Sequence, residues 1–183
     1  CDWSSDVCSS DLWLERRTVA TSGEMVSIMA AEVSAKLDLL LNERVGDVQF
    51  LAESLAMHGT TPAVRTHILS TFYQAYPLYL WIGIVDPAGR ITEATIPQAR
   101  GLDVRATGWF QAARRERAGF HVGDIAADEA GHGAETVSFT APIVDHRLDA
   151  GRRPFRGAVT TRVSARQMEQ LVTEAIRLFQ QQT

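Results

Sequence analysis

The sequence lacks several features that would define a chemistry. Its only two cysteines, Cys1 and Cys8, stand at the very start of the 183-residue chain. The rest therefore has no disulfide framework, thiol nucleophile or CxxC site, and it tolerates either the cytoplasm or an oxidising compartment. No run of about 18 apolar residues occurs, so no segment is predicted to cross a membrane. The net charge is −4, which argues against a nucleic-acid partner.

Catalytic and metal-binding motifs are also missing. The sequence contains no P-loop, GxGxxG, HExxH or GxSxG motif. His121, Asp124 and His132 are the one combination that suggests a metal site, but surface histidines in loops are the favoured interpretation. Asp128 and Glu129 are adjacent and would face opposite sides of a strand, which argues against paired acid–base catalysis. We therefore predict no enzyme activity, no metal and no cofactor.

The first twelve residues, CDWSSDVCSSDL, have neither helical nor strand periodicity. They resemble translated sequencing-adapter DNA, and we interpret residues 1–12 as a non-native tail. The alternative is a disordered acidic tail closed by one disulfide. Because the chain does not begin with Met and stops at LFQQQT, we expect it to be a fragment.

A long amphipathic helix follows. Between about residues 18 and 57 there is no proline, and apolar residues recur every three or four positions. A helix of about forty residues is far longer than the usual 11–12. One small domain cannot cover so long a stripe, so we expect residues 13–60 to form a signalling helix that makes a homodimer. The alternative is a helix of an intramolecular bundle.

The pattern then changes to a mixed α+β domain. Thr61 and Pro62 are typical of a helix start. The strands YLWIGIVD, ITEAT, FHVGDIA, ETVSFTAPIVD and FRGAVTTRVS follow, with a short helix from Trp109 and a ten-residue loop at 146–155. Hairpin connections indicate an antiparallel sheet with helices on one side. We therefore predict a domain at 61–164 and a connecting helix at 165–183, which the sequence cuts short.

The segments YLWIGIVDPAGRITEAT, DVRATGWFQAA, FHVGD, FTAPIVD and FRGAVTTRVS, in this order after a long helix, resemble a Cache domain. The resemblance covers about residues 18–175. It implies a PAS-like fold and a periplasmic, extracytoplasmic sensor of a bacterial histidine kinase, diguanylate cyclase or chemoreceptor. It also implies an upstream transmembrane segment that is missing here. In double-Cache receptors the corresponding part is the membrane-distal module.

The resemblance also points to a ligand pocket over the sheet. In this family a Trp-Phe pair, here Trp109 and Phe110, follows an arginine by two positions and helps to build the pocket. In the amino-acid-binding branch that arginine holds the ligand carboxylate, and an aspartate closing the last strand holds the ammonium. This sequence has Thr107 and Arg162 at those two places, with Arg105 the nearest arginine.

An arginine in place of an aspartate favours carboxylate or phosphate over ammonium. If Arg162 and Arg105 face the pocket, we expect a small organic anion as ligand, with Asp124 at the rim. Trp81, Arg105, Thr107, Trp109, Phe110, Asp124 and Arg162 are the predicted ligand-binding residues. The alternative places Arg162 on the outer face of its strand, with an apolar or empty pocket.

Two other functions remain open on the sequence alone. One is a cytosolic PAS-type module that binds haem or flavin, although haem requires a well-placed histidine and flavin photochemistry usually a cysteine. The other is a purely structural dimerisation module.

Overall fold

The computed structural model describes residues 4–58, 61–115, 119–131, 133–144 and 154–180. Most of the loop predicted at 146–155, and His132, lie outside the described residues. The chain divides into two compact units, one of residues 40–171 and the other of residues 1–39 with 172–183.

The second of these units is helical. It holds the N-terminal part of α1 (Ser4–His58) and the C-terminal part of α4 (Ala165–Gln180). The helix α1 begins at Ser4, before the predicted start at residue 13, and no proline interrupts it. Residues 4–12, which were predicted to lack helical periodicity, are therefore helical. Within the N-terminal part of α1, Val26 and Ile28 are 65% and 61% exposed. The predicted dimer contact along α1 stays a prediction.

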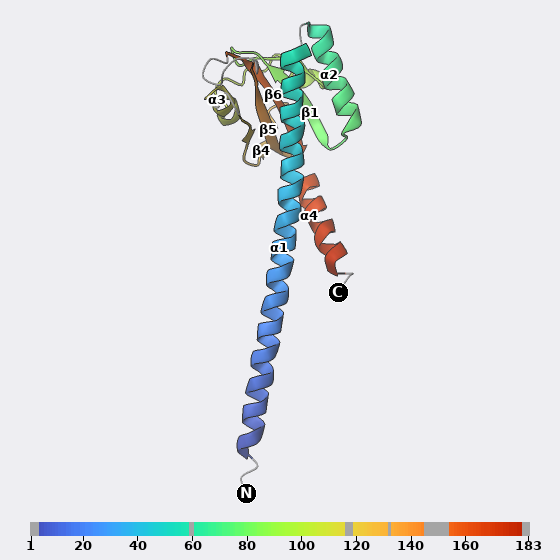
Figure 1. The fold of residues 1–183 in the computed structure, drawn as a ribbon. Helices are drawn as coiled ribbons and strands as arrows, with labels where there is room; N and C mark the ends of the chain where they lie inside the picture. The colour runs from blue at the N-terminus through green and yellow to red at the C-terminus, as the bar shows by residue number, and fades with distance from the viewer. Residues whose placement is uncertain (1–3, 59–60, 116–118, 132, 145–153, 181–183) are drawn as a thin grey trace. The chain divides into compact units, whose positions relative to one another are not determined.

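Residues 40–171 are built around one antiparallel sheet (Figure 1). Its strand order is β2-β1-β6-β5-β3, and the short β4 also pairs with β5. The predicted α+β fold class is confirmed. The elements of this unit besides α1 and α4 are α2 (Pro62–Ala75), β1 (Tyr79–Val85), β2 (Ile91–Ala94), a 3-10 turn (Pro97–Ala99), α3 (Gly108–Arg115), β3 (His121–Val122), β4 (Ala126–Ala127), β5 (Glu135–Val144) and β6 (Phe155–Ser164).

One face of the sheet is covered by α2 and the C-terminal part of α1. Alternate residues of the central strands, among them Phe139 and Val163, point to this face and are fully buried. They pack with Val48 of α1 and Leu69 of α2. The hydroxyl of Tyr79 donates a hydrogen bond of 2.6 Å to the carboxylate of Asp47, and this bond ties α1 to β1.

The helix α2 begins where the sequence predicts. The hydroxyl of Thr61 accepts a hydrogen bond of 3.3 Å from the amide of Val64, and Pro62 occupies the first turn. These two residues satisfy or remove amide groups that have no partner inside the helix.

The short helix α3 lies over the opposite face. Trp109 and Phe110 pack there with Trp81, Val85 and Ile91 in a second apolar cluster. A bulge between Tyr79 and Trp81 places Tyr79 with the helix-side core and Trp81 with this cluster. The sheet therefore has a covering layer on both faces, with the longer helices on one of them.

The predicted hairpin between β1 and β2 is present. The amide of Gly89 donates a 3.0 Å hydrogen bond to the carbonyl of Asp86. Gly89 has φ +83°, and a Cβ there would collide with the side chain of Arg105. Both the backbone angle and the close approach require glycine at this turn.

The single strand predicted at 120–126 is instead divided into β3 and β4. The divide lies at Gly123, whose amide donates a 2.8 Å hydrogen bond to the carbonyl of Ser138 on β5. A Cβ at Gly123 would collide with the hydroxyl of Ser138. Glycine therefore lets this segment approach β5 closely at Ser138.

Candidate ligand pocket

A row of polar side chains crosses the face of the sheet under α3. It comes from the positions of β5 and β6 that alternate with the helix-side core. The strand register pairs Ser138 with Arg162 and Thr140 with Thr160. All four are buried, and the two threonine hydroxyls lie 2.8 Å apart. A polar row at this depth points to a site rather than to a packing layer.

Arg162 is the centre of this row. Its guanidinium carbon lies 4.8 Å from the ring centre of Trp81 and 4.8 Å from that of Trp109. Trp81 is its neighbour across the β1–β6 pair, and Trp109 comes from α3. Arg162 is only 1% exposed. Two aromatic faces thus hold a buried cation in a fixed orientation.

The hydrogen-bonding groups of this guanidinium all have partners. Nη1 donates to the hydroxyl of Thr160 at 2.5 Å and to the carbonyl of Thr161 at 3.1 Å. Nε and Nη2 donate to the carboxylate of Glu129 at 3.0–3.2 Å. Burial lowers the pKa of Arg162, and the carboxylates of Glu129 and Asp128 act in the opposite direction. The ion pair with Glu129 thus offsets part of the cost of burying the cation.

Asp128 and Glu129 converge on this stack. The indole N–H of Trp81 donates to Asp128 at 2.8 Å, and that of Trp109 donates to Glu129 at 2.9 Å. The two carboxylates follow β4 and enter a turn, in which the amide of Gly131 donates to the carbonyl of Asp128 at 3.1 Å. A turn does not impose the alternation of a strand, so adjacent side chains can reach one site.

The expectation that these two carboxylates face opposite sides is therefore not met. The glycines of the segment DEAGHG were the signal for the turn, since Gly131 and Gly133 both have positive φ. Neither acid was among the predicted site residues.

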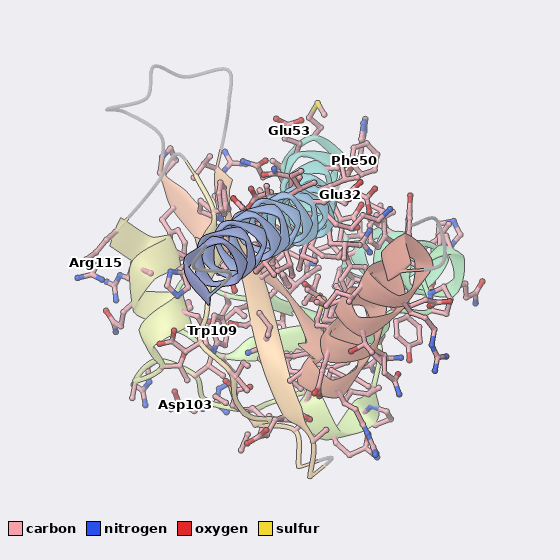
Figure 2. All side chains as sticks on the ribbon, turned by 90° about the horizontal axis from the view of Figure 1, so that it is seen from below. Glu32, Phe50, Glu53, Asp103, Trp109 and Arg115 are labelled. Atoms are coloured by element: carbon pink, nitrogen blue, oxygen red, sulfur yellow. The ribbon has the colours of Figure 1, made fainter. Side chains whose placement is uncertain are left out.

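A cavity of about 210 Å³ opens over the stack. Trp109, Glu129 and Arg162 form one part of its wall, and β5 contributes Thr136 and Ser138. Figure 2 shows Trp109 turned toward the strands, whereas Arg115 of the same helix points outward. The remaining lining residues are Gly108, His121, Gly123, Asp124, Ala126 and Ala127.

The predicted site residues lie in three places: at the cavity, in the apolar cluster under α3 and on the loop before α3. Trp109, Asp124 and Arg162 line the cavity, and Trp81 lies against Arg162. Phe110 is fully buried and makes edge contacts with Trp109 and Phe155, with ring centres 6.2 and 6.0 Å apart. It belongs to the apolar cluster under α3 rather than to the cavity wall.

Arg105 and Thr107 are not among the residues that line the cavity. Arg105 is exposed and makes several hydrogen bonds to the carboxylate of Asp103, the shortest of them 2.6 Å. These bonds lower the pKa of Asp103 to about 2. The hydroxyl of Thr107 donates to the carbonyl of Val104 at 2.8 Å, next to the start of α3. Both residues shape the loop before α3.

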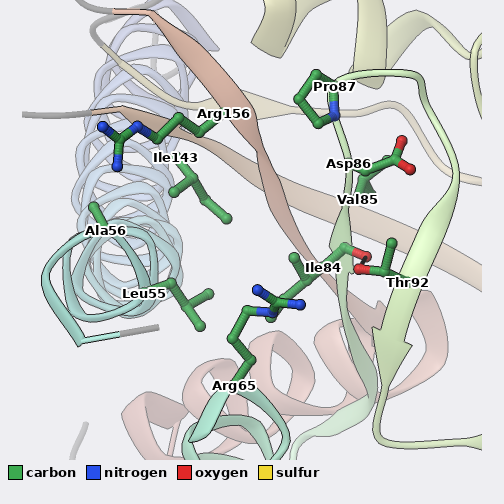
Figure 3. Close-up of a pocket in the computed structure, with 10 residues that line it drawn as sticks. All are labelled: Leu55, Ala56, Arg65, Ile84, Val85, Asp86, Pro87, Thr92, Ile143 and Arg156. Atoms are coloured by element: carbon green, nitrogen blue, oxygen red, sulfur yellow. Dashed lines mark hydrogen bonds between the residues drawn. The ribbon is translucent and has the colours of Figure 1, made fainter. Parts of the chain in front are cut away.

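Two other cavities lie in the same unit. One of about 380 Å³ has an apolar floor that includes Ile84 and Ile143, with Arg65 and Arg156 at separate places around it (Figure 3). Arg65 is paired there with Glu93 at 2.5 Å. The other, of about 700 Å³, is a groove between α1 and α2. Of these three cavities, the one over Arg162 is lined by a fully buried charged side chain.

Within the described part of the chain, no group of three or more His, Cys, Asp or Glu side chains is placed to hold a metal ion. No helix among these residues combines the length and the apolar character that a bilayer crossing requires.

No family model and no curated protein sequence matches this chain. Solved structures do. The chain is similar to an extracellular ligand binding receptor from Desulfohalobium retbaense, with a TM-score of 0.68 and 14% identity. It is also similar to the ligand-binding domain of the Pseudomonas fluorescens chemoreceptor CtaA in complex with L-alanine, with a TM-score of 0.66 and 16% identity.

A third similar structure is the ligand-binding domain of the Pseudomonas aeruginosa amino acid chemoreceptor PctC in complex with GABA, with a TM-score of 0.62 and 18% identity. The matches cover 81%, 81% and 85% of this chain and 26%, 62% and 68% of the respective structures. The chain therefore spans less than two thirds of the first two. The fold is that of chemoreceptor ligand-binding domains.

Proposed function

We propose that this chain is a small-molecule sensing module from the extracytoplasmic, periplasmic part of a bacterial transmembrane receptor, as in the Cache sensors that its sequence resembles. Its ligand carries a carboxylate and binds in the cavity over Arg162. The observation that supports this most is the convergence of N–H donors from Arg162 and Trp109 on one carboxylate position in the cavity wall. Two indole rings hold that arginine rigidly, as a recognition site requires.

The size of the cavity supports a small ligand. A volume of about 210 Å³ is below the usual range for drug-sized ligands, about 300–1,000 Å³. The similar chemoreceptor domains hold L-alanine and GABA, and each of those molecules has one carboxylate. A mono- or dicarboxylate and an amino acid both fit these limits.

The prediction that the ligand is an anion depends on one arginine, Arg162. Arg105, one of the predicted pocket residues, lies on the loop before α3 and is paired with Asp103. The cavity also has Asp124 on its exposed rim. An amino acid would place its ammonium near Asp124, whereas a simple organic acid would leave Asp124 in water. The predicted ligand, an organic acid without an ammonium group, is thus one of two classes that we propose, and an amino acid is the other.

Sensing itself follows from a difference in affinity between two conformations. A ligand shifts an equilibrium only by the ratio of its affinities for the two states. We propose that the helices α1 and α4 carry that shift and that the intact receptor is a homodimer through α1. A kinase, cyclase or chemoreceptor signalling domain would then read it.

The test is a binding screen on this chain with mono- and dicarboxylates, amino acids and amines, followed by calorimetry. We expect carboxylate-bearing compounds to raise the melting temperature and amines without a carboxylate to have no effect. Ala126 pairs with Thr136 across β4 and β5, so its side chain faces the cavity with Thr136. Ala126→Phe should fill the cavity and abolish the response.

Ala106→Phe is the matched control, because Ala106 is exposed and outside the cavity lining. It should bind like the parent. Asp124→Asn separates the two ligand classes: it should weaken an amino acid at least tenfold and leave a simple carboxylate unchanged. Binding that survives Ala126→Phe would place the ligand elsewhere and contradict the proposal.

A further inference from the structure

The carboxylate of Glu129 occupies a position that a free carboxylate would fill equally well. Nε and Nη2 of Arg162 donate to it at 3.0–3.2 Å, and the indole N–H of Trp109 donates to it at 2.9 Å. These donors come from β6 and α3, whereas Glu129 comes from the turn after β4. Their geometry selects two carboxylate oxygens and does not require them to belong to the chain.

Glu129 is also the accessible member of the pair. Its side chain is 30% exposed, while that of Arg162 is 1% exposed. Both residues line the same cavity. Because Nε and Nη2 of Arg162 are already bonded to the Glu129 carboxylate, a carboxylate solute in the cavity can accept the same hydrogen bonds only if that carboxylate moves.

The neighbouring acid has a different attachment. Asp128 is buried and accepts its hydrogen bond from Trp81, so it holds the segment at the stack independently of Glu129. Glu129 can therefore turn away from Arg162 while Asp128 stays bound to Trp81. The amide of Asp128 is bonded to the carbonyl of Ala134 at 3.0 Å, which fixes the base of the turn.

We infer that Glu129 is a tethered competitor: it fills the carboxylate position of the cavity, and a carboxylate ligand binds by displacing it. This inference rests on the proposed function. The exchange leaves no buried charge unpaired, because the guanidinium of Arg162 has a carboxylate partner both before and after the ligand binds. A short tether gives an effective concentration of about millimolar, which the ligand must overcome.

Two consequences follow for the sensor. Glu129 lowers the affinity for every carboxylate by a common factor, so it sets the concentration at which the domain responds. Displacement also frees Glu129 from α3, because its bond to Trp109 is lost together with that to Arg162. Occupation of the cavity is thereby coupled to the contact between α3 and the turn after β4.

Acetate is the probe for this exchange, and Glu129→Ala is the variant that vacates the position. Acetate should bind Glu129→Ala at least tenfold more tightly than the parent, with sodium chloride at equal ionic strength as the salt control. The readout at the site is the indole N–H signal of Trp109 in a nitrogen–proton NMR spectrum. It should shift in Glu129→Ala and return toward its parental position as acetate is added.

Asp124→Ala is the matched control, since it removes a carboxylate from the same cavity that the structure does not join to Arg162. It should bind acetate as weakly as the parent. Equal acetate binding by Glu129→Ala and the parent, or an unmoved Trp109 signal, would overturn the inference. If Glu129→Ala does not fold alone, acetate-dependent folding supports the inference. If acetate does not restore its fold, Glu129→Asp decides, because its shorter side chain should compete less and allow tighter acetate binding.

The two proposals fail in different ways. If the parent binds a carboxylate ligand and Glu129→Ala binds that ligand no more tightly, the exchange is wrong and the proposed function stands. If Glu129→Ala binds acetate but the parent binds no compound in the screen, the carboxylate position is confirmed and the proposed function fails.

Discussion

The two faces of the central strands differ in what they bury. On the face under α1 and α2, β6 presents Val159 and Val163, and β5 presents Phe139. On the face under α3, the alternating positions of the same strands present Thr160 and Arg162. Both sets of strand residues are buried, but among these residues of β5 and β6 only the second set includes a charged side chain, Arg162.

The difference separates stability from binding within one sheet. Apolar side chains need no partners, so the residues that β5 and β6 present to α1 and α2 stabilise the fold through burial, at roughly 25 cal/mol per Å². Polar side chains at the same depth stabilise little when paired and cost much when unpaired. The face under α3 contributes less stability, but it holds a group of hydrogen-bond donors in fixed positions. This is the usual pattern at functional sites.

The largest effect should come from the apolar face. Phe139→Ala removes a fully buried ring from the helix-side core. We expect the free energy of unfolding to fall by about 3–5 kcal/mol, from lost burial and the cavity left behind. Urea unfolding followed by circular dichroism measures it. Phe120→Ala is the control, since Phe120 is 43% exposed, and it should change stability by about 0.5 kcal/mol or less. Equal losses in the two variants would contradict the assignment of the core.

A smaller effect is expected when the charged pair under α3 is replaced as a whole. Arg162→Met combined with Glu129→Gln keeps the approximate volume and removes both charges of the ion pair, so neither member is left buried without the other. We expect stability within about 2 kcal/mol of the parent, in either direction, together with complete loss of carboxylate binding. Calorimetric unfolding and ligand titration measure the two quantities.

A polar substitution on the face under α1 and α2 serves as the comparison for this double variant. Val163→Thr adds one hydroxyl to a fully buried position of the apolar cluster. It should cost about 1–3 kcal/mol without affecting ligand binding. If the paired replacement under α3 destabilises the domain by several kcal/mol more than Val163→Thr, the ion pair is a main support of the fold and the comparison of the two faces fails.

Much of the fold could be predicted because it depends on local pattern. The period of the apolar residues gives the long helix, and the Thr61-Pro62 start and the Asp86–Arg90 turn are set by neighbouring residues. The division of the strand at Gly123 could not be predicted in this way. It depends on a contact with Ser138, which is near Gly123 only in the folded sheet.

The candidate site could be predicted only in part. Arg162 and Trp109 were found through a resemblance to a known pattern, and both line the cavity. Glu129 was missed because its role depends on a turn that brings it to Arg162, which is 33 positions away in the sequence. Arg105 was included only because it stands close to Trp109 in the sequence, and its side chain is bonded to Asp103 instead.

The smallest effect is expected for Arg105, whose ion pair with Asp103 is exposed, in contrast to the buried guanidinium of Arg162 in its pair with Glu129. Hydrogen bonds from Arg105 hold the pKa of Asp103 near 2 in the folded protein. An unfolded aspartate titrates near 3.9. The contact therefore favours the folded state above pH 4, and this contribution is lost as the pH falls toward 2. Because the pair is exposed, the effect on stability should be hard to detect.

Arg105→Ala tests this through the carboxyl titration of Asp103, followed by carbon NMR. The pKa of Asp103 should rise toward its ordinary value but not reach it, because the backbone N–H of residue 105 still donates to the carboxylate. Ligand affinity should stay within twofold of the parent, since Arg105 is outside the cavity lining. In Arg162→Met, by contrast, the Asp103 titration should not change and carboxylate binding should be lost. A tenfold loss of affinity in Arg105→Ala would return this arginine to the site, as the sequence pattern first indicated.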